Sequence, residues 1–174
     1  MAMFRKNIRF IGKHAEILQK YSKDKGAETN VSFMISNQSG EVKNIYIFET
    51  RLYCYMVAGM LGIINNKSVE EDRENKNMSA TIFAEILNNN QQNLERLYHH
   101  MVLSENNELS VDGKIKKAFS IVPDDKCDEE QHKLENYVRG GLEIIDEVFK
   151  DCKTYEDICN AFYSFKEMLD LNEK

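Results

Sequence analysis

The chain has 174 residues, of which 42% are hydrophobic and 30% charged, with one proline and no tryptophan. This length predicts one domain over residues 1–174, with a core large enough to fold without a metal or disulfides. The composition excludes a disordered chain, a collagen-like chain and a proline-rich architecture, and it disfavours a β-sandwich with many turns.

The net charge is −6, but the basic residues are concentrated at the start of the chain. Residues 1–30 hold seven Lys or Arg against three acidic residues, a balance of +4, so the other 144 residues sum to −10. A basic start is typical of an arm that binds nucleic acid or an edge that docks on an acidic surface, and also of an ordinary solvated helix face. We favour the solvated face because most charge runs are of that kind.

The four cysteines form no C-x-x-C pair and have no histidine at ligand spacing, so we expect reduced thiols. The first 25 residues lack the apolar segment of a signal peptide. The longest uncharged run covers residues 52–66 and is shorter than a membrane span. We therefore expect a soluble, cytoplasmic protein with no membrane association.

The first third of the chain predicts a helix and a β-hairpin. Apolar residues spaced by three and four predict a helix over residues 4–23, and Gly12 marks a point where it can break. Residues 31–48 are rich in β-branched and aromatic side chains around a turn at residues 37–40. They predict a hairpin, with an ordered extended loop as the alternative.

Two long helical patterns follow. Residues 52–64 are apolar on all sides, which is typical of a helix buried by its neighbours. Residues 80–103 carry a heptad seam with Asn90 at a core position. This seam is the inner face of a bundle helix or the contact of a homodimer in which Asn90 fixes the register; we favour the inner face.

Three further helices complete the prediction. A short helix capped by Asp112 ends near Phe119, a helix over residues 131–149 contains Gly140 and Gly141, and a last helix begins at a Thr154 cap. The two adjacent glycines predict a close helix crossing or a bend. The predicted fold is all-α: a bundle of five to six helices around a buried central helix at 52–64, with the hairpin as an appendage.

Motifs that carry chemistry are missing from the sequence. There is no phosphate-binding loop, His99 and His100 are adjacent and cannot chelate one metal, and no E-x-x-H motif occurs. Cys54 lies in the apolar helix, and the acidic neighbours of Cys127 are expected to raise its pKa. We therefore predict no catalytic residues, no metal site and no cofactor, and classify the chain as not an enzyme. A buried carboxylate pair in a cleft would favour an enzyme instead.

Three segments resemble a family of small helical proteins. The segments are residues 57–63 (VAGMLGI), 118–122 (AFSIV) and 136–149 (NYVRGGLEIIDEVF), and the resemblance extends over about half of the chain. They resemble accessory proteins encoded near bacterial DNA-modification and phage-defence genes of the phosphorothioation-associated type. The resemblance implies an accessory subunit of a multi-protein bacterial system and assigns no catalytic residue.

Two functions follow from these observations. The first is a non-enzymatic accessory or adaptor subunit that docks on a larger protein partner, with Arg139, Tyr137 and Tyr163 as contact residues because aromatic and Arg side chains dominate interface energies. The alternative is a nucleic-acid-binding protein that uses the basic N-terminal helix. Its contact residues are Arg5, Lys6, Arg9 and Lys13.

Overall fold

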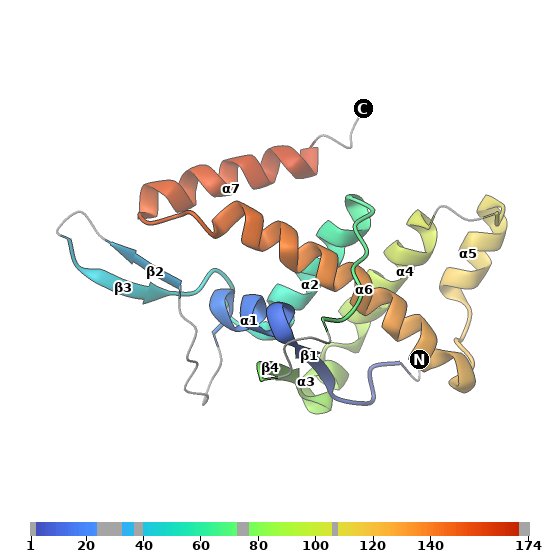
Figure 1. Cartoon of the computed structure of the whole chain (residues 1–174). Coiled ribbons are helices and arrows are strands. Elements are labelled where there is room, and N and C mark those ends of the chain that lie inside the picture. Colours follow the sequence, from blue (N-terminus) through green and yellow to red (C-terminus); the bar gives the residue numbers. More distant parts are fainter. Residues whose placement is uncertain (1–2, 24–32, 37–39, 73–76, 106–107, 171–174) are drawn as a thin grey trace.

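A computed structural model describes residues 3–23, 33–36, 40–72, 77–105 and 108–170 of the chain. This part of the chain is predominantly helical, with seven helices and two short antiparallel pairs of strands, so the all-α prediction is correct only in its main feature (Figure 1). The elements in chain order are β1 Ile8–Ile11, α1 Gly12–Tyr21, β2 Phe33–Ser36, β3 Val42–Ile45, α2 Arg51–Ile64, β4 Ser79–Ile82, α3 Ala84–Asn89, α4 Gln91–Ser104, α5 Val111–Phe119, α6 Asp124–Phe149 and α7 Tyr155–Asp170.

The crossing of α2 and α6 forms the most extensive packing in the molecule, and α2 also contacts α1 and α4. The two helices approach so closely that side chains are excluded at the contact. A Cβ atom on Gly141 would lie 1.7 Å from the carbonyl oxygen of Ala58, and one on Gly62 would lie 1.9 Å from the carbonyl oxygen of Tyr137. The close crossing predicted from the glycine pair is confirmed.

The N-terminal segment differs from the predicted helix over residues 4–23. Residues 8–11 form β1, which pairs antiparallel with β4 in the register Ile8↔Ile82. Helix α1 begins only at Gly12, which has φ +61° and therefore permits the change from strand to helix. In β1, buried Ile8 and Phe10 alternate with exposed Arg9, which is the period of a strand. The apolar residues of this segment also fit a helical spacing, and for this reason the sequence predicts a helix there.

The predicted hairpin is confirmed. Strands β2 and β3 pair antiparallel in the register Phe33↔Ile45, while residues 31–32 and 37–39 of the prediction lie outside the described residues. The backbone N–H of Ser36 donates to the carbonyl oxygen of Lys153 at 2.8 Å, which attaches the hairpin next to the start of α7 (Figure 1).

The predicted single helix over residues 80–103 is wrong. Its first residues form β4, and the rest is divided into α3 and α4 at Asn90. Asn90 is half-buried, and its side-chain amide donates to the carbonyl oxygen of Ile86 at 2.9 Å instead of facing a core partner. Leu94 and Leu97 of the seam are buried inside this chain, so that part of the seam forms internal core and offers no face to a second copy.

The last three helices lie near their predicted positions. Helix α5 is capped by Ser110, whose Oγ accepts from the N–H of Gly113, and Asp112 stands in its first turn rather than at the cap. Helix α6 begins at Asp124, seven residues before the predicted start at 131. The Thr154 cap of α7 is confirmed, because its Oγ1 accepts from the N–H of Asp157 at 3.1 Å.

Candidate functional site

The four basic residues predicted to bind nucleic acid do not share a helix. Arg5 and Lys6 precede β1, Arg9 lies on β1, and Lys13 lies on α1. Lys6 pairs with Asp128 at 2.8 Å and Lys13 with Glu143 at 2.6 Å. Since these acidic residues are fifteen positions apart on α6, the two lysines contact sites separated by about 22 Å along that helix. The predicted basic helix is therefore absent from the described N-terminal segment.

The three predicted contact residues have different environments. Arg139 is only 2% exposed, so it faces the interior and not a partner. Its guanidinium donates to the side chains of Asn136 and Glu135 and lies 5.7 Å from the ring centre of Phe10. The prediction of Arg139 as a surface contact is wrong, because the side chain serves the internal packing of α6 against β1.

The two tyrosines lie closer to the surface than Arg139. Tyr137 is half-buried against the core, and its carbonyl oxygen belongs to the contact with Gly62 at the α2–α6 crossing. Tyr163, on α7, has an exposed fraction of 71%. Of the three, Tyr163 is the one that presents most of its surface to solvent.

A cleft of about 430 Å³ lies between α1 and α6. Its charges are largely neutralised within the chain: Lys13 pairs with Glu143, and both Lys20 Nζ and Tyr21 Oη donate to Asp146 at 3.0 and 2.7 Å. Burial alone would raise the pKa of Glu143, but the hydrogen bonds from Lys13 and Lys67 outweigh it and lower that pKa. The charged side chains that line the cleft form an ion-pair network that joins α1 to α6.

Behind this cleft lies the buried imidazole of His14. Burial is the main cause that lowers its pKa to about 4, with the positive charge of Lys13 second and the opposing effect of Glu143 third. Neither ring nitrogen has a hydrogen-bond partner in the described part of the chain, although Nε2 lies 3.5 Å from Oε1 of Glu143. His14 is therefore neutral at neutral pH.

Three of the four cysteines, Cys54, Cys127 and Cys152, are buried. The pKa of Cys127 is raised by burial and by Asp124 and Asp128, in the direction predicted from its acidic neighbours. Burial also raises the pKa of Cys54. Within the described ranges, no group of three or more His, Cys, Asp or Glu residues has metal-binding geometry, and no helix combines the length and apolar character of a membrane span.

Helix α5 carries an apolar stripe that is largely exposed, although the ring of Phe119 lies beside that of His99 on α4, with ring centres 4.5 Å apart. Val111, Ile115 and Phe119 recur every four residues, and Val111 and Phe119 are 74% and 66% exposed. Ile121, just beyond the helix, is 86% exposed. We call these four residues the α5 face. A soluble domain normally turns such a stripe inward, so an outward stripe indicates a surface for another molecule.

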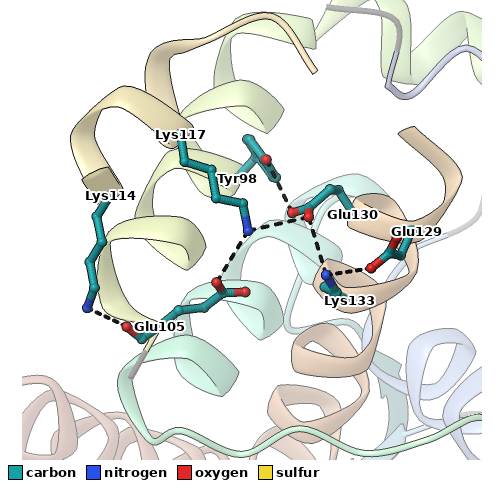
Figure 2. A network of polar contacts seen from close by, with 7 residues as sticks. All are labelled: Tyr98, Glu105, Lys114, Lys117, Glu129, Glu130 and Lys133. Atoms are coloured by element: carbon teal, nitrogen blue, oxygen red, sulfur yellow. Dashed lines mark hydrogen bonds and ion pairs between the residues drawn. The ribbon is translucent and has the colours of Figure 1, made fainter. Parts of the chain in front are cut away.

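Polar side chains also hold α5 against the rest of the chain. Figure 2 shows Lys114 donating to the carbonyl oxygen of Glu105 and Lys117 reaching the side chain of the same residue at 3.5 Å. Ala118 is the one residue of α5 that is fully buried. These contacts hold α5 against the rest of the chain, with the buried Ala118 next to the largely exposed stripe.

Glu130 is the centre of this polar network. It is 7% exposed and lies near the start of α6, where Oε1 is 3.3 Å from the ammonium groups of both Lys117 and Lys133 (Figure 2). The hydroxyl of Tyr98 donates to Oε2 of Glu130 at 3.2 Å. Burial and the Glu130 carboxylate both raise the pKa of Tyr98, so the phenol stays protonated and remains a donor.

A pocket of about 270 Å³ adjoins both the network and the α5 face. Ile121, Val122 and Pro123 form its apolar wall, while Tyr98 and Glu130 contribute polar atoms. Lys117, Ser120 and Lys126 complete the lining. The exposed apolar stripe therefore ends beside a concavity that can receive one side chain of another molecule.

Sequence reasoning missed the α5 face although its signal was present. The spacing of Val111, Ile115 and Phe119 predicts an amphipathic helix, but such a stripe is normally assigned to the core. Its outward direction depends on Glu105 and Glu130, which belong to other elements.

Comparisons with protein-family models, with curated proteins and with solved structures found no match to this chain. The function proposed below therefore depends on the geometry of the chain itself.

Proposed function

We propose that this chain is a non-enzymatic accessory subunit that binds a segment of a larger protein partner through the α5 face. The observation that carries the proposal is the outward apolar stripe of Val111, Ile115 and Phe119, which continues into Ile121. An amphipathic segment of a partner can lay its own apolar side against such a stripe, as helices do in apolar grooves.

The energetics favour a covered α5 face. Full burial of one large apolar side chain contributes about 1.5–3 kcal/mol relative to leaving it exposed. Phe119 and Ile121 retain most of their surface in the isolated chain, so this contribution is still available to a complex. The ion pairs behind α5 keep the stripe in place before binding, which reduces the entropy lost in the complex.

The rest of the chain serves as a support for this surface. We propose the predicted arrangement of helices around α2 as that support, since α2 contacts α1, α4 and α6. The resemblance of residues 57–63, 118–122 and 136–149 to accessory proteins of bacterial DNA-modification and phage-defence clusters supports a place in a multi-protein system of that kind.

The proposal is tested by affinity purification of the tagged chain from its own host, with nuclease treatment and quantitative mass spectrometry. Three forms are compared: the wild-type chain, Phe119→Asp and the matched control Tyr163→Asp, which places the same charge on the exposed aromatic residue of α7. We expect one protein to copurify with the wild-type chain in stoichiometric amount after nuclease treatment. The Tyr163→Asp chain should retain this partner, while the amount that copurifies with Phe119→Asp should be lower by about ten-fold or more.

Retention of the partner by Phe119→Asp would contradict the assignment to the α5 face. Loss of the partner in Tyr163→Asp alone would move the contact to α7. Loss of every partner on nuclease treatment would favour the nucleic-acid alternative instead.

A further inference from the structure

We infer that the outer edge of β3 accepts an extended strand of another protein, which lengthens the β2–β3 hairpin into a three-stranded sheet. This edge lies on a different part of the chain from the α5 face, so it is a second interaction surface beyond the function proposed above. Three features of the hairpin support it: the direction of the backbone groups of β3, the anchoring of β2, and the exposed apolar side chains on one face.

The backbone groups of β3 point toward β2 and away from it at alternate residues. The N–H of Ser36 donates to the carbonyl oxygen of Lys153, so it points away from β3, and Ser36↔Val42 is a non-hydrogen-bonded pair of the ladder. Because the two kinds of pair alternate along an antiparallel ladder, the pair at Lys43 is hydrogen-bonded and the pair at Asn44 is not. The N–H and C=O groups of Val42 and Asn44 therefore point outward, and we call these groups the β3 edge.

No strand lies along the β3 edge in the described part of the chain. The sheet there consists of β2 and β3 alone, and the bridge between Ser36 and Thr154 lies along the opposite edge, that of β2. Within the described ranges, Val42 and Asn44 form no backbone hydrogen bond with another element, and both residues are exposed. Outward N–H and C=O groups of an edge strand match the groups of another extended backbone, which a lipid or a nucleic acid does not present.

The rest of the hairpin is anchored to the molecule. Phe33 and Ile35 of β2 are 3% and 1% exposed, and the ring of Phe33 meets that of Tyr21 edge-to-face, with ring centres 5.3 Å apart. In Figure 1 the hairpin extends from the helical part of the molecule with β2 on the side of α7. The β3 edge is thus held in place before binding, which reduces the entropy lost when a strand is added.

The exposed face of the hairpin indicates which side chains the added strand carries. Met34 and Val42 are 56% and 61% exposed, and they are diagonal neighbours on one face because Met34 stands opposite Asn44. In a strand added beside β3, the residues opposite Val42 and Asn44 lie on this same face. Apolar residues at these alternate positions would cover Val42, so we expect a partner segment with apolar residues spaced by two.

A second copy of β3 fits this edge less well than a strand of another protein. Only one antiparallel register pairs Val42 and Asn44 of one copy with Asn44 and Val42 of the other and so uses the whole β3 edge of both. Registers centred on Val42 or on Asn44 require Gly40 or Tyr46 instead, which lie outside β3. Gly40 also has φ +82°, which is not an extended conformation. The complete register is centred on Lys43.

This register places Lys43 opposite its counterpart in the second copy. The two would form a non-hydrogen-bonded pair, in which facing side chains approach most closely, and like charges directly opposite destabilise paired strands. The exposed ion pair of Lys43 with Glu41 of its own chain, at 3.4 Å, reduces this repulsion but leaves the two ammonium groups in facing positions. A strand of another protein uses the same backbone groups without this contact.

The test selects peptides on the immobilised full-length chain from a displayed library of random peptides, each about twelve residues long. The Asn44→Pro chain serves for counter-selection. Proline lacks the outward N–H and places its ring on the outer side of β3, while the hydrogen bonds between β2 and β3 remain. The matched control Asn44→Ala removes the same side chain and keeps the N–H. Urea unfolding of the three chains checks that they are equally folded.

A second measurement leaves the chain unchanged. Each residue of an enriched peptide is N-methylated in turn, and the affinity of each methylated peptide for the wild-type chain is determined. In an added strand only every second N–H points to β3, so N-methylation should weaken binding at alternate residues and not at those between them. This pattern distinguishes strand addition from docking through side chains even if Asn44→Pro alters the hairpin.

We expect enriched peptides with apolar residues at alternate positions. They should bind wild type and Asn44→Ala within about two-fold of each other, and Asn44→Pro about ten-fold more weakly, the effect of one lost hydrogen bond. N-methylation should cost about ten-fold at each sensitive residue for the same reason. The Phe119→Asp chain should bind these peptides as wild type does, because the α5 face is a separate surface.

Several outcomes would overturn the inference. Peptides that bind Asn44→Pro unchanged and show no alternation on N-methylation would refute strand addition, and so would the absence of any peptide that distinguishes wild type from Asn44→Pro. A dimer of the wild-type chain in sedimentation equilibrium that Asn44→Pro abolishes and Asn44→Ala retains would assign the β3 edge to a second copy. These outcomes leave the α5 face unaffected, since Phe119→Asp tests it separately.

Discussion

Helices α2 and α5 both carry apolar residues, but they direct them to opposite environments. Helix α2 contacts α1, α4 and α6, and its Leu52, Tyr55 and Leu61 are buried while Tyr53 is exposed. In α5 only Ala118 is fully buried, and the apolar stripe faces solvent. The difference teaches that the apolar side of a helix is buried only where neighbouring elements surround it.

The largest expected effect is at the α2–α6 crossing. Gly141→Ala places a methyl group against the carbonyl oxygen of Ala58, and backbone on both helices must move to admit it. We expect a loss of about 3 kcal/mol in the free energy of unfolding, the upper end for overpacked sites, measured by urea denaturation. The matched control is Gly113→Ala in α5, where the nearest atom to the new methyl group is a side-chain atom, Oγ of Ser110 at 3.3 Å, and not backbone. That variant should change stability by about 1 kcal/mol or less.

If both glycine variants lost the same free energy of unfolding, the α2–α6 crossing would not be packed more tightly than α5.

The next effect is a dependence of stability on pH through His14. Its pKa is about 4 in the folded chain and near the ordinary value of 6.5 in the unfolded chain, so between these values the unfolded state binds more protons. Stability is therefore expected to fall as pH is lowered from about 6.5 to about 4, by about 3 kcal/mol in total from this group. The measurement is the urea midpoint as a function of pH in wild type and in His14→Leu, which lacks this titration. Equal slopes for the two chains between pH 6.5 and 4 would contradict the assignment.

A smaller effect is expected in the network that orients α5. Glu130→Gln removes the charge that two lysines and Tyr98 share, and it should cost about 1–2 kcal/mol because the site is buried. The matched control Glu129→Gln changes a neighbouring, exposed carboxylate of the same network and should leave the thermal midpoint unchanged. If the two variants have the same midpoint, Glu130 does not hold α5 in its outward orientation.

The smallest effect on stability is expected on the α5 face itself. Ile121→Asp replaces a side chain that is 86% exposed, so the free energy of unfolding should change by less than about 0.5 kcal/mol. Thermal and urea unfolding of the purified chain measure this. A large loss would show that Ile121 packs against the chain, and the α5 face would then be part of the core.

Local chemistry allowed several elements to be predicted from sequence. The Thr154 cap, the apolar run of α2 and the β-branched residues of the 33–45 hairpin each act within a few residues. The glycines at 140 and 141 indicated a close crossing because only a residue without Cβ tolerates it. The β1–β4 pair was missed because its strands are about seventy residues apart, and periodicity within a window contains no information about such pairing.

The functional site likewise combines features that depend on local sequence with features that depend on the tertiary structure. The sequence by itself determined that the chain is mostly helical and that an apolar helix covers residues 52–64. Only the tertiary structure decided that Arg139 is buried against Phe10 and that the stripe of α5 points to solvent. The physical reason is that helical spacing specifies which residues share a face. The direction of that face depends on ion pairs with Glu105 and Glu130 on elements that are brought together only by folding.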